Sequence, residues 1–174
     1  MPQQLETIKI TAEQILSHPT WDVILLFVLL AVGFFYGISA GKTRVAATII
    51  YTYVALAVFS VLPTNKLASF FGGVEIFLVK IVVFCALFLV LAFLLGSRKK
   101  RGFAPASSWW QIFLLSLLQV GFLIHIILSF LPEEKIKMLA PITKRFFANP
   151  DLHIWWLVIP IAVIVLLRRF ESDN

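Results

Sequence analysis

The sequence predicts an all-α integral membrane protein, a polytopic helical bundle with about five transmembrane helices, four of them clear and the fifth short. Three observations predict this fold class. Hydrophobic residues make up 60% of the 174 residues, and charged residues only 14%, whereas ordinary globular proteins contain about 25% charged residues. The mean hydropathy is +0.96. The apolar residues also gather in runs that match the thickness of a bilayer, and a soluble domain of this size could not bury them.

Residues 1–20 predict an amphipathic N-terminal segment. Leu5, Ile8, Ala12 and Ile15 fall near helical spacing with polar residues between them, and the pattern breaks at Pro19. The segment has no continuous apolar stretch, which argues against a cleavable signal peptide. A short helix lying on the membrane and an unstructured soluble tail remain equal alternatives at this point.

Residues 21–131 predict a four-helix transmembrane core. Residues 21–40 span about 30 Å as a helix, and the carboxylate of Asp22 in the first turn complements the helix dipole. The second run follows a tight basic turn at residues 41–44 and ends before Pro63, because proline cannot continue a helix. The predicted spans are residues 21–40, 45–62, 76–95 and 109–131.

Residues 132–153 predict an amphipathic outer loop. Its apolar residues lie at near-helical spacing among charges and are interrupted by Pro141. This pattern indicates two short amphipathic helices on the outer leaflet, with an ordinary ordered loop as the alternative.

Residues 154–174 predict a short fifth span and a basic cytoplasmic tail. The apolar run 154–167 contains Pro160, and its 14 residues reach only about 21 Å, so spanning would require a locally thinner bilayer. Trp155 and Trp156 at one end and Arg168 at the other resemble interfacial anchors. A span is therefore favoured over a re-entrant segment.

The basic residues predict the orientation. With five spans, the basic residues of the turn 41–44, the loop 97–108 and the C-terminal tail lie on one side of the membrane. The positive-inside rule assigns that side to the cytoplasm. The N-terminus is then outside and the C-terminus inside. The outer loop disagrees in part, since it also contains four basic residues. The net charge of +6 accordingly indicates topology rather than nucleic-acid binding. The topology-determining residues are Lys42, Arg44, Arg98, Lys99, Lys100, Arg101, Arg168 and Arg169.

Three glycines predict a helix-packing face. Gly33, Gly37 and Gly41 repeat at every fourth position of the first span, so that a neighbouring backbone can approach closely. We expect the second span to be the partner, either within one chain or between two chains. Its small or polar stripe, which we expect to hydrogen-bond across to the first span, consists of Thr48, Tyr51, Thr52 and Ala55.

Four polar residues are candidates for a role within the membrane: Asp22, Lys80, Gln119 and His125. Asp22 reads as a helix cap. Lys80 lies one turn inside the third span, where snorkelling to the headgroups beside Glu75 is favoured over a substrate role. A proton or ion relay needs several converging titratable groups, so His125 alone favours a hydrogen-bonded packing histidine.

Catalytic patterns are missing from the sequence. It contains no intramembrane aspartate pair, no H-E-x-x-H, no G-x-S-x-G and no phosphate-binding glycine loop. The histidines at 18, 125 and 153 are scattered, and the single Cys85 has no partner, so we expect no metal site and no cofactor. An enzyme is not expected.

The first two spans resemble the colicin V production (CvpA) family. The resembling residues are Trp21 and Asp22, then Gly37 and Gly41 leading into a basic turn with an immediate return helix. Residues 107–111 depart from the Asp-Arg and glycine-spaced motif of that family, and the fifth span is unusual, so the chain resembles a divergent member. The resemblance implies a non-enzymatic bacterial inner-membrane protein linked to colicin V production or export and to envelope homeostasis.

Two functional hypotheses follow. The first is a non-enzymatic accessory or scaffold protein that contacts lipid, a second copy of itself or an envelope protein. The alternative is a small oligomeric transporter or channel subunit, in which Lys80, Gln119 and His125 face a common aqueous path.

Overall fold

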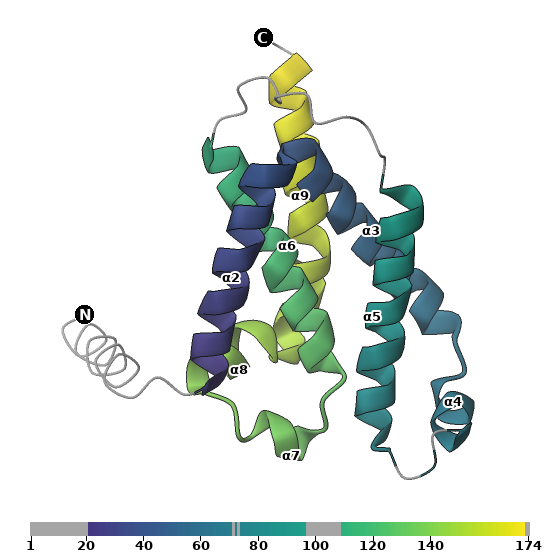
Figure 1. The fold of residues 1–174 in the computed structure, drawn as a ribbon. Coiled ribbons are helices and arrows are strands. Elements are labelled where there is room, and N and C mark those ends of the chain that lie inside the picture. The colour runs from purple at the N-terminus through teal and green to yellow at the C-terminus, as the bar shows by residue number, and fades with distance from the viewer. Residues whose placement is uncertain (1–20, 71, 73, 97–108, 173–174) are drawn as a thin grey trace, which may run out of the picture.

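The computed structural model describes residues 21–70, 72, 74–96 and 109–172, and every element within them is a helix (Figure 1). Five helices are long and apolar enough to cross a membrane, which confirms the all-α, multi-pass membrane fold. The predicted N-terminal amphipathic segment and the basic run 98–101 lie outside the described residues. The long helices are α2 (Trp21–Ala40), α3 (Lys42–Val61), α5 (Ile76–Leu95), α6 (Trp109–Ser129) and α9 (His153–Ser172). The short ones are α4 (Thr64–Phe70), α7 (Glu133–Ile136), α8 (Pro141–Phe147) and the 3₁₀ turn η1 (Pro150–Leu152).

A single residue separates α2 from α3, so the predicted four-residue turn at 41–44 is wrong. Gly41 has a φ of 81°, a left-handed conformation that glycine adopts without steric penalty. Its N–H donates to the carbonyl of Gly37 (2.8 Å), and its own carbonyl accepts from Arg44 (3.1 Å). Lys42 and Arg44 therefore belong to the first turn of α3.

The fifth apolar run, although itself short, belongs to a longer helix. The 20 residues of α9 extend about 30 Å, because the helix continues into the polar residues at both ends of the apolar run. It also continues through Pro160, whose ring nitrogen cannot donate to the preceding turn. The carbonyl that loses its helical donor is that of Trp156, four residues before the proline. The Tyr53 hydroxyl of α3 donates to the next carbonyl, that of Leu157, at 2.6 Å.

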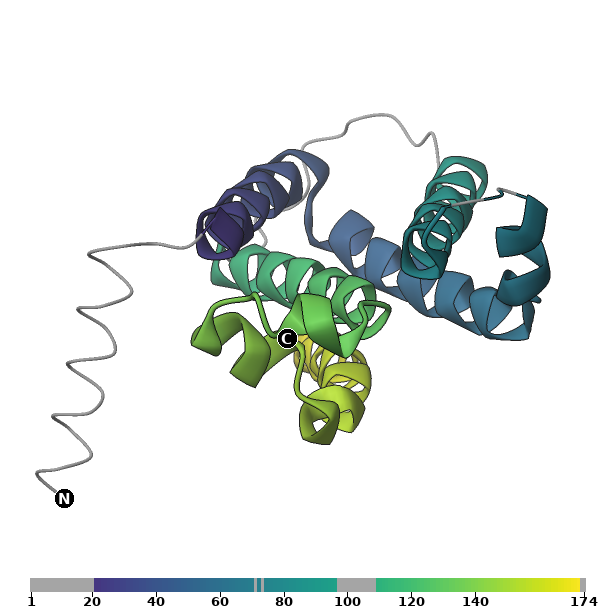
Figure 2. The same ribbon diagram turned by 90° about the horizontal axis from the view of Figure 1, so that it is seen from below.

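Helix α6 is the centre of the bundle. It packs against α2, α3 and α9, whereas α5 packs against α3 and α4. Figure 2 shows the result: α2, α6 and α9 lie together, and α3 leads away from them toward α5. Two buried clusters hold these helices. One contains Ala55, Phe59, Phe84, Phe122 and Ile126, and the other contains Val45, Ile49 and Leu115.

The loop of residues 132–153 folds back onto the start of α2. It contains two short helices, α7 and α8, and Pro141 begins the second of them. Leu139 and Ala140 between them are buried, and the N–H of Ala140 donates to Oδ2 of Asp22 at 2.8 Å. Asp22 thus fixes a segment more than one hundred residues away, in addition to its place in the first turn of α2.

The two ends of the bundle differ in which segments they contain. The α2–α3 link and the C-terminal ends of α5 and α9 lie at one end, and α4, α7 and α8 lie at the other (Figure 1). The hydropathy pattern did not predict α4, a seven-residue helix directly after Pro63 that packs on α5.

Candidate functional site

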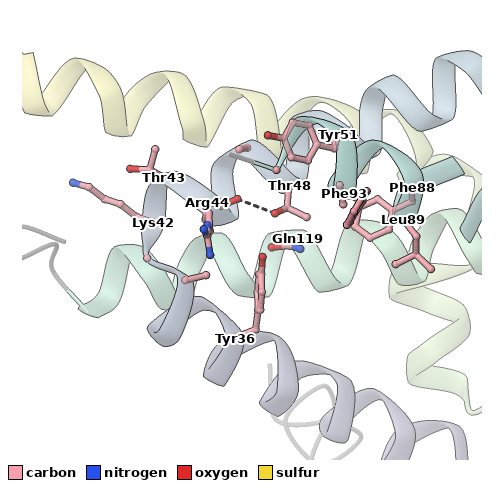
Figure 3. A pocket seen from close by; sticks show the side chains of 15 residues that line it. Tyr36, Lys42, Thr43, Arg44, Thr48, Tyr51, Phe88, Leu89, Phe93 and Gln119 are labelled. Carbon is pink, nitrogen blue, oxygen red and sulfur yellow. Dashed lines mark hydrogen bonds between the residues drawn. The ribbon is translucent and has the colours of Figure 1, made fainter. Parts of the chain in front are cut away.

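A cavity of about 810 Å³ lies between α2, α3, α5 and α6, and we call it the polar cavity. Ligand sites in proteins are commonly of about 300–1,000 Å³. It opens near the α2–α3 link, and residues from all four helices line it (Figure 3). The polar lining residues that matter below are Tyr36, Lys42, Arg44, Thr48, Tyr51 and Gln119.

Gln119 is the most unusual residue of the polar cavity. Its exposed fraction is only 8%, it lines the cavity, and within the described part of the chain its side-chain amide has no hydrogen bond. In Figure 3 the amide lies between Tyr36 of α2 and Thr48 of α3. The Gln119 amide atoms face the cavity and are not enclosed by the protein, so the cavity presents a polar group that makes no hydrogen bond within the described residues.

Two cations stand at the mouth of the polar cavity. Arg44 and Lys42 lie in the first turn of α3, where the N-terminal N–H groups and the helix dipole also favour negative charge. Figure 3 shows the Arg44 side chain on the Gln119 side, while the Lys42 ammonium extends away from Gln119.

The hydroxyl groups of Thr48 and Thr52 on α3 hydrogen-bond to carbonyls of their own helix. Thr48 donates to the carbonyl of Arg44 at 2.8 Å, and Thr52 donates to the carbonyl of Thr48 at 3.0 Å. The predicted hydrogen bonding from these threonines to a neighbouring helix is therefore wrong. Tyr51 is the member of the stripe that bonds across, since its hydroxyl donates to the carbonyl of Leu95 on α5 at 2.8 Å.

The wall that α5 contributes is apolar. Phe88, Leu89, Ala92 and Phe93 line it. Leu89 is 64% exposed and Phe93 is 77% exposed, so this wall continues onto the outer surface of the bundle. Since the helix is of transmembrane length, that surface meets lipid or another protein.

The glycine face of α2 packs on α6, not on α3 as predicted. A Cβ at Gly33 would collide with the side chain of Val120, and one at Gly37 would collide with Ser116. The reason is the link at Gly41, after which α3 leads away and α6 lies along α2. Gly41 itself serves the turn.

A second group of polar and aromatic residues lies where α6, α8 and α9 meet, and we call it the histidine cluster: His125, Phe147, His153 and Trp156. Nδ1–H of His125 donates to the carbonyl of Phe147 at 2.7 Å, and Nε2 lies 2.8 Å from Nδ1 of His153. Since a neutral imidazole has one donor and one acceptor nitrogen, Nε2 accepts from Nδ1–H of His153. His125 is 2% exposed and both of its nitrogens are bonded.

Trp156 completes the histidine cluster. Its ring stacks on His125 with 6.0 Å between centroids and 18° between planes, and its Nε1–H donates to the carbonyl of Phe146 at 2.7 Å. Gly121 makes room for it, because a Cβ there would come within 2.6 Å of the indole. The cluster thus joins α8 and α9 to α6.

His125 is a hydrogen-bonded packing histidine, as the sequence favours, but it does not stand alone, because His153 is its partner. Sequence reasoning missed the pair because 28 residues separate the two histidines, and spacing over a long loop does not place them. The sequence signal beside His153 was the pair Trp155 and Trp156, which resemble interfacial anchors.

The other candidates lie apart from these two groups. Glu75 pairs with Lys135 (3.7 Å between Oε2 and Nζ) and not with Lys80 as expected. Lys80 is partly buried on α5 and does not line the polar cavity. His125 faces α8 and α9, whereas Gln119 faces the cavity, so Lys80, Gln119 and His125 share no path in the described residues.

The described residues contain no group of three or more His, Cys, Asp or Glu side chains that could hold a metal ion. No family model, no curated protein and no solved structure matches the chain.

Proposed function

We propose that the chain is a divergent protein of the colicin V production type, with a non-enzymatic accessory or scaffold role in the bacterial inner membrane. That role concerns toxin production or export and envelope homeostasis. The resemblance of Asp22, Gly37 and Gly41 with the adjoining basic residues supports the family assignment. The arrangement of the buried polar groups supports the scaffold role.

The observation that carries the scaffold role is that most buried polar contacts tie one segment of the chain to another. Asp22 binds the link between α7 and α8, Tyr53 binds α9, and the histidine cluster joins α6 to α8 and α9. A fixed shape of this kind suits a protein that presents surfaces to partners, whereas a proton or ion path requires titratable groups that converge.

The proposed orientation places the N-terminus outside and the C-terminus in the cytoplasm. The α2–α3 link with Lys42 and Arg44 lies at the same end as the C-terminal half of α9 (Figure 1), and the positive-inside rule assigns that end to the cytoplasm. Two of the contrary cations at the other end are engaged: Lys135 pairs with Glu75, and Lys144 donates to the carbonyl of Lys137 at 2.6 Å.

Cysteine labelling tests this orientation. In a Cys85→Ser background, a membrane-impermeant maleimide should label Glu134→Cys in intact spheroplasts and Arg169→Cys only after permeabilisation. The reverse pattern would overturn the orientation, and labelling of both cysteines in intact spheroplasts would overturn the fifth span.

The scaffold role is tested by crosslinked affinity purification from native membranes, read by mass spectrometry. We expect a stoichiometric envelope or secretion protein, and a defect in colicin V release when the chain is deleted. Recovery of the chain only as a defined oligomer, with release unchanged, would contradict the scaffold role.

The second candidate is a small oligomeric transporter or channel subunit. The polar cavity is the observation that favours it. Solute flux into reconstituted vesicles would support it. Flux that survives the combined change of Arg44→Gln and Gln119→Leu, both of which line the polar cavity, would exclude the cavity from its mechanism.

A further inference from the structure

We propose that the polar cavity binds the phosphate-bearing headgroup of an anionic membrane lipid, with the Arg44 guanidinium on the phosphate and the Gln119 amide donating to the headgroup. The inference rests on the membrane location and is independent of the proposed scaffold role.

The first argument is the state of Gln119. More than nine-tenths of this residue is buried, its amide is directed into the cavity, and the described chain provides it no partner. Buried polar groups in proteins are generally hydrogen-bonded. An amide that has no partner in the described chain is therefore available to a bound molecule. Headgroup oxygens are acceptors for its N–H groups.

The second argument is charge. Arg44 lines the same cavity as Gln119, and guanidinium matches the geometry of a phosphate with paired N–H donors. The first turn of α3 adds helix N–H groups and the positive end of the dipole, because Lys42 and Thr43 begin that helix. The polar end of the cavity therefore favours an anion.

The third argument is the shape of the cavity. Its polar end passes into the apolar wall of Phe88, Leu89 and Phe93, and Leu89 and Phe93 are largely exposed on the surface of a helix of transmembrane length. A soluble anion uses only the polar end. A phospholipid uses both, since its acyl chains lie along α5 while its headgroup occupies the cavity.

Native mass spectrometry of the purified full chain tests the proposal, with phosphatidylglycerol and phosphatidylcholine offered at equal concentration. We expect wild type to retain phosphatidylglycerol in preference. Arg44→Gln and Gln119→Leu should each weaken that retention about tenfold, the effect of losing one charge-assisted or buried hydrogen bond. The matched control Arg169→Gln removes a cation at the same end but outside the cavity, and should change retention less than about twofold.

Three results would overturn the proposal. One is equal retention of the two lipids by wild type, and another is an equal loss in Arg169→Gln. The third is displacement of the lipid by millimolar inorganic phosphate, which would assign the site to a free anion.

A photoactivatable phosphatidylglycerol on wild-type protein gives a second test that needs no variant. We expect the label in residues 36–51 and 88–96, and a label spread evenly over all five long helices would contradict the site.

Discussion

The two sides of α6 use polar residues in opposite ways. On the side of α8 and α9, His125 bonds with both ring nitrogens and stacks on Trp156. On the side of the polar cavity, Gln119 is buried to a similar degree and has no bond within the described residues. Helix α6 thus contains one polar residue, His125, that is hydrogen-bonded within the fold, and another, Gln119, whose amide can bind a ligand.

This difference indicates that the few polar residues of α6 have two roles. Those on the side of α8 and α9 stabilise the fold, and Gln119 on the other side can bind a ligand. Hydrogen bonds within membrane proteins contribute modestly, on average about 0.6 kcal/mol each, but several of them with ring stacking fix α8 and α9 on α6. An amide that faces a cavity without a partner in the described residues can bind a ligand, and a ligand that binds the folded chain stabilises it. Comparing variants on the two sides therefore tests which side holds the fold together.

The largest effect is expected for Gly37→Leu, which acts on the α2–α6 contact beside the cavity. The new side chain would collide with Ser116 and Ile112, and overpacking of this kind costs about 3 kcal/mol or more. Unfolding by dodecyl sulfate in mixed micelles, followed by tryptophan fluorescence, measures it. Gly72→Leu is the control, because a Cβ there meets nothing within 4 Å. Equal effects of the two changes would refute the α2–α6 packing.

Next in size is His125→Ala, which breaks the histidine cluster. It removes two hydrogen bonds and leaves a cavity, so the free energy of unfolding should fall by about 2–4 kcal/mol. His153→Ala removes one hydrogen bond from an exposed position and should cost less than half as much. If His153→Ala were the more damaging, the cluster would be organised around His153 instead.

Asp22→Ala should have an intermediate effect at the far end of the bundle. The loss of the bond to the N–H of Ala140 should cost about 1.5–3 kcal/mol, the usual range for a hydrogen bond to a charged group. It should also accelerate hydrogen exchange across residues 132–148. Asp22→Asn keeps an acceptor oxygen and should retain most of the protection, and the exposed Asp151→Ala should retain all of it. Unchanged hydrogen exchange in Asp22→Ala would show that Asp22 does not hold residues 132–148 on α2.

The smallest effects are expected for two tyrosines on α3. Tyr53→Phe removes the donor to Leu157 near Pro160, and Tyr51→Phe removes the donor to Leu95 at a more exposed position. We expect losses of about 0.5–1.5 kcal/mol for Tyr53→Phe and less for Tyr51→Phe. The reverse order would show that the α3–α5 contact beside the cavity is the stronger one.

The long apolar helices could be predicted from the sequence because hydropathy alone defines them. Residues 21–40 and 76–95 form helices with the predicted ends. The errors concern features that depend on geometry rather than composition. One glycine at position 41 reverses the chain, and polar flanks extend α9 beyond its apolar run.

The candidate site was predictable only as separate residues. Gly37, Gln119 and His125 stand out as small or polar positions in apolar runs, but their partners come from other helices. Helical spacing identifies which face of α6 each residue occupies. It does not identify that α2 covers one face or that α9 covers another, because the angle at which α3 leaves α2 decides this.

The most direct test of the difference between the two sides compares Gln119→Leu with His125→Leu in delipidated detergent and again with phosphatidylglycerol. Without lipid, we expect Gln119→Leu to unfold within about 0.5 kcal/mol of wild type or to be more stable, and His125→Leu to lose about 2–3 kcal/mol. Added lipid should stabilise wild type and His125→Leu by about 1–3 kcal/mol, and Gln119→Leu by about 1 kcal/mol less than wild type, since its binding is about tenfold weaker. Equal destabilisation without lipid, or equal stabilisation of all three by lipid, would contradict the account.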